Sequence, residues 1–310
     1  MHTVTVYPPL RHGLLNVYFL QTPDAVSLPQ EVVLYLTALK SGQVKVKEQR
    51  TPTIRRLHVH NLSEKLVFVL PGTVVFGGLQ DRIVATAALL EPGEQTVDIS
   101  SFCVEPARWH PERARTPDFY ILENEFLHYA SHLVRTRALH EADQLQVWNA
   151  VHHERAKACR AYKARLISSS IRDVHDIPEL SERIGHSLQE LREALTKFPT
   201  ATGIALALGS HLVEINLFSN RQLLEICYPV VLGGYLRDTL IYGLPRTQEA
   251  PSSEQVQQLA LTQPFSLTHE AKPARHNRVI IGPVNDQFDA LILEYRGQTV
   301  YKQIMKHANF

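Results

Sequence analysis

Short runs that alternate apolar and polar residues fill the first third of the chain, as in half-buried β-strands. Residues 57–60 (Leu-His-Val-His) show this two-residue period most clearly. Proline and glycine turns separate the runs. The pattern predicts a sandwich or a partly open barrel. Strands are expected at residues 14–20, 44–49, 56–61 and 65–70, and in a hairpin over residues 83–102.

The expected hairpin turns at residues 91–94 (Glu-Pro-Gly-Glu), because Pro-Gly between two strand-like runs is a turn signal. Pairing outward from this turn places Arg82 opposite Cys103 and Gln80 opposite Glu105. Facing residues of paired strands lie ~5 Å apart. Two polar blocks that are distant in sequence should therefore meet at the open end of the hairpin. A β-bulge near residues 100–102 would shift this register by one residue.

Helical spacing dominates the middle of the chain. Residues 116–118 (Thr-Pro-Asp) resemble a helix start, and a helix is expected over residues 119–140. A second helix is expected from Asp143 into the 160s, and a third from about residue 176. These helices are predicted to pack as an antiparallel bundle. The third has the clearest apolar stripe, at Ile177, Leu180, Ile184, Leu188, Leu191, Leu195 and Phe198, which must be buried in the bundle or against a second subunit.

Strand patterns return in the last third. A hairpin is expected to turn at residues 209–210, and Asn220 to cap a helix that Pro229 kinks. Residues 244–272 read as a linker with one short helix. A similar second hairpin is expected at residues 296–297, a weak indication of internal duplication.

The predicted fold class is α+β in three parts. Residues 1–115 would form the β-rich sandwich or partly open barrel with the candidate ligand site, and residues 116–200 the central antiparallel helical bundle. Residues 201–310 would form a C-terminal strand–helix–strand part that packs on the rest.

Composition indicates an ordinary globular protein, with 44% hydrophobic and 20% charged residues among 310. A net charge of +1 gives no general attraction to nucleic acid or to anionic membranes. Three cysteines cannot all pair with one another and are read as reduced thiols. The first residues lack a signal-peptide pattern, and no apolar run approaches the ~20 residues that span a bilayer. We therefore expect a cytoplasmic protein.

The two polar blocks contain the groups of a nucleotide-like site. Arginine offers a planar fork for phosphate or carboxylate. Glutamate accepts bonds from ribose hydroxyls, and tryptophan offers a stacking face. The alternative is a salt bridge between Arg82 and Glu105 that ties the hairpin, with Trp109 as a core anchor. The candidate ligand-binding residues are Gln80, Arg82, Glu105, Arg108 and Trp109.

Cys103 is a candidate nucleophile, because Arg82 opposite it would lower the pKa of its thiol and His110 is near in sequence. A buried, inert thiol is the alternative that we favour. Sixteen histidines raise the question of a metal, with His128 and His132 four residues apart. No third ligand stands at a diagnostic spacing. We expect no bound metal and no cofactor, and we expect these histidines to be solvated or on helix faces.

Residues 57–109 resemble the family of ADP-ribosylglycohydrolase- and rhodanese/phosphatase-superfamily-associated proteins. The likeness rests on Gly77, Gln80 and Arg82 in a Gly-x-x-Gln-Asn-Arg segment and on residues 103–109 in a closing Cys-Val-Glu-x-x-Arg-Trp. Residues 71–74 depart from it, since Pro, Thr and Val stand where the family has acidic residues. Asp81 replaces its Asn, and Leu79 a frequent Lys. The resemblance implies a genomic association with ADP-ribose and NAD metabolism, and no particular reaction.

Three functions follow as hypotheses. The preferred one is a binding or regulatory protein for a nucleotide-derived metabolite, with ADP-ribose or an NAD breakdown product first. The second is an enzyme for such a metabolite, with Glu105 as acid or base or Cys103 as nucleophile. The third is a structural partner protein with no small-molecule ligand. Neither nucleic acid nor a membrane is expected as a partner, and the helical block offers a contact for a homo-oligomer.

Overall fold

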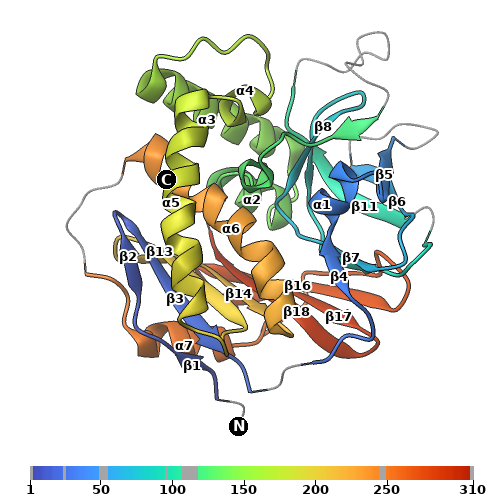
Figure 1. Ribbon diagram of the computed structural model, residues 1–310, viewed down its shortest axis with the longest axis vertical. Helices are drawn as coiled ribbons and strands as arrows, with labels where there is room; N and C mark the ends of the chain where they lie inside the picture. The colour runs from blue at the N-terminus through green and yellow to red at the C-terminus, as the bar shows by residue number, and fades with distance from the viewer. Residues whose placement is uncertain are drawn as a thin grey trace.

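A computed structural model describes residues 3–23, 26–48, 55–94, 97–106, 118–243 and 249–307, and the fold is α+β, as predicted. Its largest sheet has the strand order β1-β3-β13-β14-β18-β17-β16-β15, with β2 paired to β3 (Figure 1). The strands are β1 Thr5–Val6, β2 Leu10–His12, β3 Leu15–Gln21, β13 Gly203–Leu208, β14 His211–Phe218, β15 His269–Ala271, β16 Asn277–Asn285, β17 Phe288–Tyr295 and β18 Gln298–Lys306.

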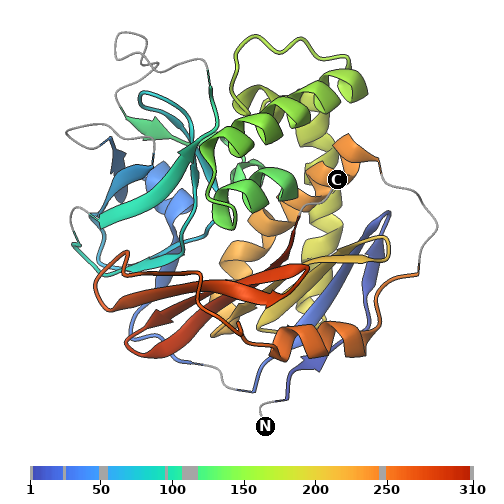
Figure 2. The ribbon, with the colours of Figure 1, turned by 180° about the vertical axis from the view of Figure 1, so that it is seen from behind.

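Both faces of this sheet are covered. Helices α5 (Pro178–Thr196) and α6 (Arg221–Tyr242) lie over one face, and α7 (Ser253–Leu261) lies over the other (Figures 1 and 2). The molecule has one hydrophobic core that includes residues of α6 and another that includes residues of α7. In β3, Val17 and Phe19 belong to the core with α6, whereas Tyr18 and Leu20 belong to the core with α7. Successive side chains of a strand point to opposite faces. The apolar run of β3 is therefore explained by burial on both sides.

Two smaller sheets and α1 (Tyr35–Lys40) make up the β-rich part. One sheet has the order β10-β7-β4 and the other β12-β8-β9-β11-β6-β5. The strands expected at residues 14–20, 44–49, 56–61 and 65–70 are confirmed as β3, β5, β6 and β7. The bounds are β4 Val32–Leu34, β5 Val44–Lys47, β6 Arg56–Asn61, β7 Leu66–Val69, β8 Val74–Gly77, β9 Arg82–Val84, β10 Ala88–Leu90, β11 Val97–Cys103 and β12 Phe119–Tyr120.

The continuous hairpin expected over residues 83–102 is wrong. Its first run divides into β9, which pairs with β11, and β10, which pairs with β7 in another sheet. β11 also changes partner, since its first four residues pair with β6. All of β10 is buried, and a run buried on both faces suits a position between two layers better than a half-solvated hairpin. The pairing of Arg82 with Cys103 is nevertheless confirmed.

The helix expected over residues 119–140 is also wrong. Phe119–Tyr120 is a strand, η2 (Glu125–His128) is a single 3-10 turn, and α2 (His132–Leu139) begins only after the cap residue Ser131. The intervening carbonyls have other partners. Arg135 Nε donates to the Ala130 carbonyl at 2.9 Å, and Arg237 donates to the carbonyls of Leu127 and Tyr129. Tertiary bonds therefore replace the helical ladder there. Thr116 and Pro117 lie outside the described residues.

The other two helices of the middle block are confirmed as α3 (Gln144–Tyr162), capped by Asp143, and α5, which starts at Pro178. α5 packs along α6, which comes from the C-terminal third, while α2 packs on α3. The short α4 (Arg172–His175) precedes α5. The helices thus do not form a bundle confined to residues 116–200. Among the described residues, no helix combines the length and apolar content needed to cross a membrane.

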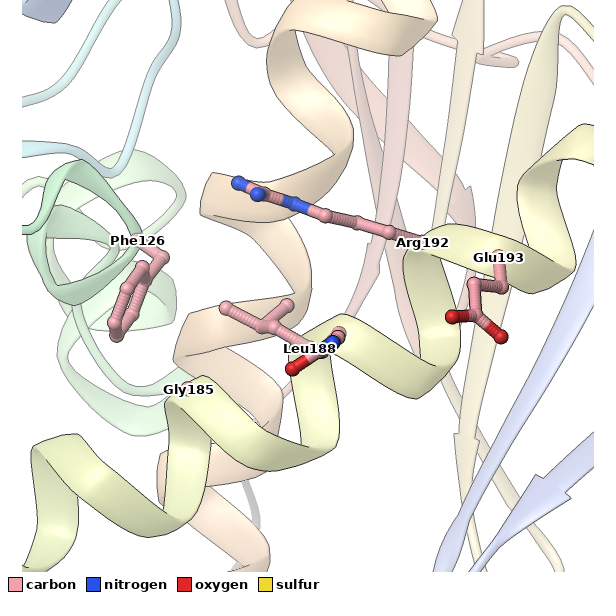
Figure 3. Close-up of a pocket in the computed structure, with 6 residues that line it drawn as sticks. Phe126, Gly185, Leu188, Arg192 and Glu193 are labelled. Carbon is pink, nitrogen blue, oxygen red and sulfur yellow. The ribbon is translucent and has the colours of Figure 1, made fainter.

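The apolar stripe of α5 is buried at Leu180, Ile184, Leu188, Leu191 and Leu195. Near its middle a groove of about 380 Å³ lies between α5 and η2, and Figure 3 shows Phe126 facing Gly185 and Leu188 across it. Arg192 and Glu193 extend in different directions from the same helix. Leu188 is therefore a member of the stripe that lines this groove.

The C-terminal elements agree with the expected pattern. Residues 209–210 turn between β13 and β14, and the Asn220 side chain caps α6 by accepting from the Leu223 N–H at 3.0 Å. Residues 296–297 turn between β17 and β18. The three-part domain division stays a prediction, and the large sheet joins β1 to β3 with the C-terminal strands.

Candidate functional site

The two polar blocks meet as the sequence predicts. Gln80, Arg82 and Glu105 are all buried. Gln80 Nε2 donates to the Glu105 carbonyl at 3.1 Å, and Arg82 Nη1 lies 3.4 Å from Gln80 Oε1. The Asp81 N–H donates to Glu105 Oε2 at 3.3 Å. We call these four residues together with Glu48 the Arg82 cluster. Arg108 and Trp109, the other candidates, lie outside the described residues.

Glu48 is the member that the sequence analysis missed. It follows β5, and both of its carboxylate oxygens accept from Arg82 Nη2, at 3.2 and 3.3 Å. Oε1 also accepts from the Leu79 N–H at 3.3 Å. Among the described residues, Arg82 forms an ion pair with Glu48, whereas the alternative considered from the sequence was a bridge to Glu105. The pattern at residues 44–49 indicates a strand that includes Glu48, but it does not say which strands lie beside it.

Asp81 fixes the segment between β8 and β9. Its Oδ1 accepts from the Gly77 N–H at 2.8 Å, and its Oδ2 accepts from the Ser170 hydroxyl at 2.5 Å. Gly77 and Gly78 both have a positive φ, a conformation that favours glycine. A Cβ at Gly78 would lie 2.5 Å from the Phe119 ring. This glycine pair therefore serves a tight turn against β12.

Cys103 does not have the surroundings of a nucleophile. Burial raises the pKa of its thiol to about 11, so the thiol is protonated at neutral pH. Its Sγ accepts from the Glu105 N–H at 3.2 Å, and Gln144 binds both its backbone N–H and its carbonyl at 2.9 Å. The residue holds the start of α3 against β11. The inert thiol favoured from the sequence agrees with this geometry.

His128 and His132 are buried, which corrects the expectation of solvated histidines, although His132 does lie on a helix, α2. They also lie on separate elements, so they do not form a pair on one helix. His128 Nδ1 lies 2.5 Å from the Val74 carbonyl, and its Nε2 accepts from the Leu122 N–H at 2.8 Å. Burial lowers the pKa of His128 to about 4 and that of His132 to about 3, so both are neutral. Within the described ranges, no group of three or more His, Cys, Asp or Glu residues is arranged to hold a metal ion.

A second buried polar cluster surrounds Arg135 and Glu214, which form an ion pair. The Arg135 guanidinium lies over the Tyr129 ring, 3.9 Å from its centroid. Although burial opposes it, Arg135 and the neighbouring donors lower the pKa of Glu214 to about 2. The only sequence signal for this cluster is a glutamate inside the apolar run 212–217. Glu214 accepts from Tyr129 Oη at 2.8 Å, Tyr235 Oη at 2.6 Å, Asn216 Nδ2 at 2.7 Å and Gln303 Nε2 at 3.0 Å.

Comparison with known proteins gives one match. Residues 3–301 match the model of the ARPP-1 family, described as the ARG and Rhodanese-Phosphatase-superfamily-associated Protein domain. No curated protein matches the chain, and no solved structure matches it. The match confirms the family that the polar blocks indicated, but its description gives only ARG and does not confirm the wording ADP-ribosylglycohydrolase. The description names neither a ligand nor a reaction. Because the match spans nearly the whole sequence, the chain belongs to the ARG and Rhodanese-Phosphatase-superfamily-associated Protein domain family.

Proposed function

We propose that this chain is a cytosolic protein that binds a phosphate-bearing, nucleotide-derived metabolite at the Arg82 cluster. ADP-ribose and NAD breakdown products come first, because the family name associates the domain with ARG and phosphatase-superfamily proteins. In this proposal Arg82 binds the phosphate, while Gln80 and Glu105 bind ribose hydroxyls. Arg108 and Trp109 belong to the proposed site through the sequence motif alone.

One observation carries the proposal. The Glu48 carboxylate is held by a guanidinium nitrogen of Arg82 and by the backbone N–H of Leu79. A guanidinium beside a backbone amide is also a good binding site for a phosphate oxygen. In this proposal Glu48 stands where the phosphate of the ligand would bind. Its side chain is 12% exposed, whereas that of Arg82 is fully buried, so Glu48 is the partner nearer to solvent.

The rival function is structural, and the burial of the cluster supports it. Gln80, Asp81 and Glu105 bond to one another and bring the segment before β9 against the end of β11. In that case Arg82 contributes to stability alone. The enzyme hypothesis retains Glu105 as acid or base, since the protonated thiol of Cys103 does not support the nucleophile route.

Calorimetric titration with ADP-ribose, AMP and inorganic phosphate tests the proposal. Arg82→Ala should weaken ADP-ribose binding by roughly tenfold or more, because a hydrogen bond to a charged group is worth ~1.5–3 kcal/mol. Glu48→Gln should strengthen binding several-fold, since it removes the competing charge. Glu270→Gln, which alters an exposed carboxylate paired with Arg278, is the control and should change nothing.

Two results would favour the rivals. If ADP-ribose does not bind the wild-type protein, while Arg82→Ala and Glu48→Gln both lower the melting temperature, the cluster is structural. If chromatography of the titrated sample shows that ADP-ribose is consumed, the protein is an enzyme. Loss of that turnover in Glu105→Gln would then assign the acid or base.

A further inference from the structure

A separate cavity of about 260 Å³ lies where α2, α3 and α6 meet the end of β13. These three helices pack on one another in the upper half of the molecule in Figure 1. The wall combines apolar surface with four side chains that can carry charge, and a small-molecule site uses such polar groups to orient its ligand. None of its residues belongs to the Arg82 cluster. The lining residues are His132, Leu133, His153, Lys157, Leu208, Asp238 and Tyr242.

Burial divides the lining into a polar base, apolar sides and a cationic mouth. His132 and Asp238 are each 3% exposed and form the base. Leu208 is buried in the side wall. His153 is exposed and Lys157 half-buried, so these two lie toward solvent. A ligand that is complementary to the base, the sides and the mouth is polar at its inner end, apolar in the middle and anionic at its outer end.

Besides the cavity itself, one unsatisfied polar atom of Asp238 supports a bound ligand. Its Oδ2 accepts from the His132 N–H at 2.9 Å. Its buried Oδ1 has no hydrogen-bond partner among the residues that the structure describes. Buried carboxylate oxygens in folded proteins nearly always accept a hydrogen bond. A donor on a bound molecule would meet this need.

The base of the cavity is fixed before any ligand arrives. His132 Nδ1 lies 3.2 Å from Tyr235 Oη, and Tyr235 donates to Glu214 at 2.6 Å. Asp238 is held by the first turn of α2 and lies on α6, which is buried along most of its length. Such a rigid base lowers the conformational entropy that the protein loses when a ligand binds.

We propose that this cavity binds a small carboxylate with an apolar body and a hydroxyl group at the end opposite its charge. The hydroxyl donates to Asp238 Oδ1, the body packs between Leu133 and Leu208, and the carboxylate meets the Lys157 ammonium. The proposal does not depend on the function of the Arg82 cluster, because the two sites share no residue.

Three probes separate these contacts at pH 8: 4-hydroxybenzoate, benzoate and phenol, each titrated by ligand-observed NMR. The first should bind about tenfold more tightly than benzoate, which lacks the donor. Asp238→Asn should remove that tenfold difference while it keeps the acceptor for the His132 N–H. Lys157→Met should weaken the binding of 4-hydroxybenzoate and of benzoate and leave the affinity for phenol unchanged. Arg160→Met, an exposed position on the same helix outside the cavity, is the control.

A variant that fills the cavity shows whether lost binding is due to the cavity or to a general loss of structure. Leu133→Phe places extra carbon in the cavity and should abolish binding of all three probes, with a melting temperature at or above that of the wild type. The proposal fails if 4-hydroxybenzoate shows no saturable binding to the wild-type protein. It also fails if Asp238→Asn and Leu133→Phe, both folded, bind that probe as well as the wild type does.

Discussion

Two buried carboxylates show how strongly the surroundings of a residue set its charge. Burial raises the pKa of Asp238 to about 7, and Glu154 adds to this effect against Arg237, Arg135 and the His132 N–H. Glu214 is equally buried, yet Arg135 and its donors lower its pKa to about 2. The difference lies first in the charge of Arg135 beside Glu214 and then in the number of hydrogen bonds that each carboxylate accepts. Glu214 accepts four from neutral donors, besides its pair with Arg135.

The raised pKa of Asp238 gives a pH-dependent prediction. Because its folded pKa lies above the unfolded value, its contribution to stability is complete at low pH and is lost as pH rises toward about 7. Asp238→Asn avoids this loss. Its stability relative to wild type should therefore rise by about 2–3 kcal/mol between pH 5 and pH 8. Urea unfolding at the two pH values measures it, and a difference that stays constant would contradict it.

Sequence reasoning reached some of these residues and not others. Arg82 and Cys103 were paired correctly by counting from a Pro-Gly turn, although the continuous hairpin assumed in that count is wrong. Glu48 and Glu214 were missed because their partners, Arg82 on β9 and Arg135 on α2, come from elements that only the folded chain brings together. A charged residue in an apolar run is the single local sign of such a site.

Among the elements, α5 is the one whose sequence pattern and structure agree best. Its apolar stripe is buried against α6 and the core, as the helical spacing required. The segment before α2 shows the opposite case. Its residues have helical spacing, but Arg135 and Arg237 bind its carbonyls, and no periodicity reveals that competition.

Because of the groove beside α5, two neighbouring leucines of this helix should contribute different amounts to the free energy of unfolding. Leu188→Ala should cost about 2–3 kcal/mol, because the space that it leaves joins the existing groove. Leu191→Ala, one turn further and away from the groove lining, should cost about 3–5 kcal/mol. Urea unfolding of both variants gives the comparison. Sedimentation should show an unchanged assembly state. A Leu188 variant that first loses assembly would instead place the stripe at a contact between subunits.

At the scale of the whole molecule, one side chain joins two sheets. Asn277 at the start of β16 accepts from the Leu89 N–H at 2.7 Å and donates to the Leu89 carbonyl at 2.9 Å. It thus completes the backbone bonding of β10 as a neighbouring strand would. No sequence pattern indicates this link, since the two residues are 188 positions apart.

Asn277→Ala should leave both buried groups of Leu89 without partners and cost about 2–4 kcal/mol. Native-state hydrogen exchange gives the specific readout. The Leu89 amide should exchange much faster in the variant, while amides in the β17–β18 ladder should follow only the global loss of stability. Equal acceleration at all these amides would show that Asn277 acts through the core and not as a link.

The position of β3 in the sequence has a consequence for the synthesis of the chain on the ribosome. This strand is apolar on both faces, and its neighbour β13 follows it by roughly 180 residues. At the usual ~5–20 residues per second, a ribosome needs about 10–40 s to make that stretch. During that interval the apolar strand β3 is not yet paired with β13, and an unpaired apolar strand is prone to aggregation. We therefore expect β3 to be a segment that aggregates if it is left uncovered during translation.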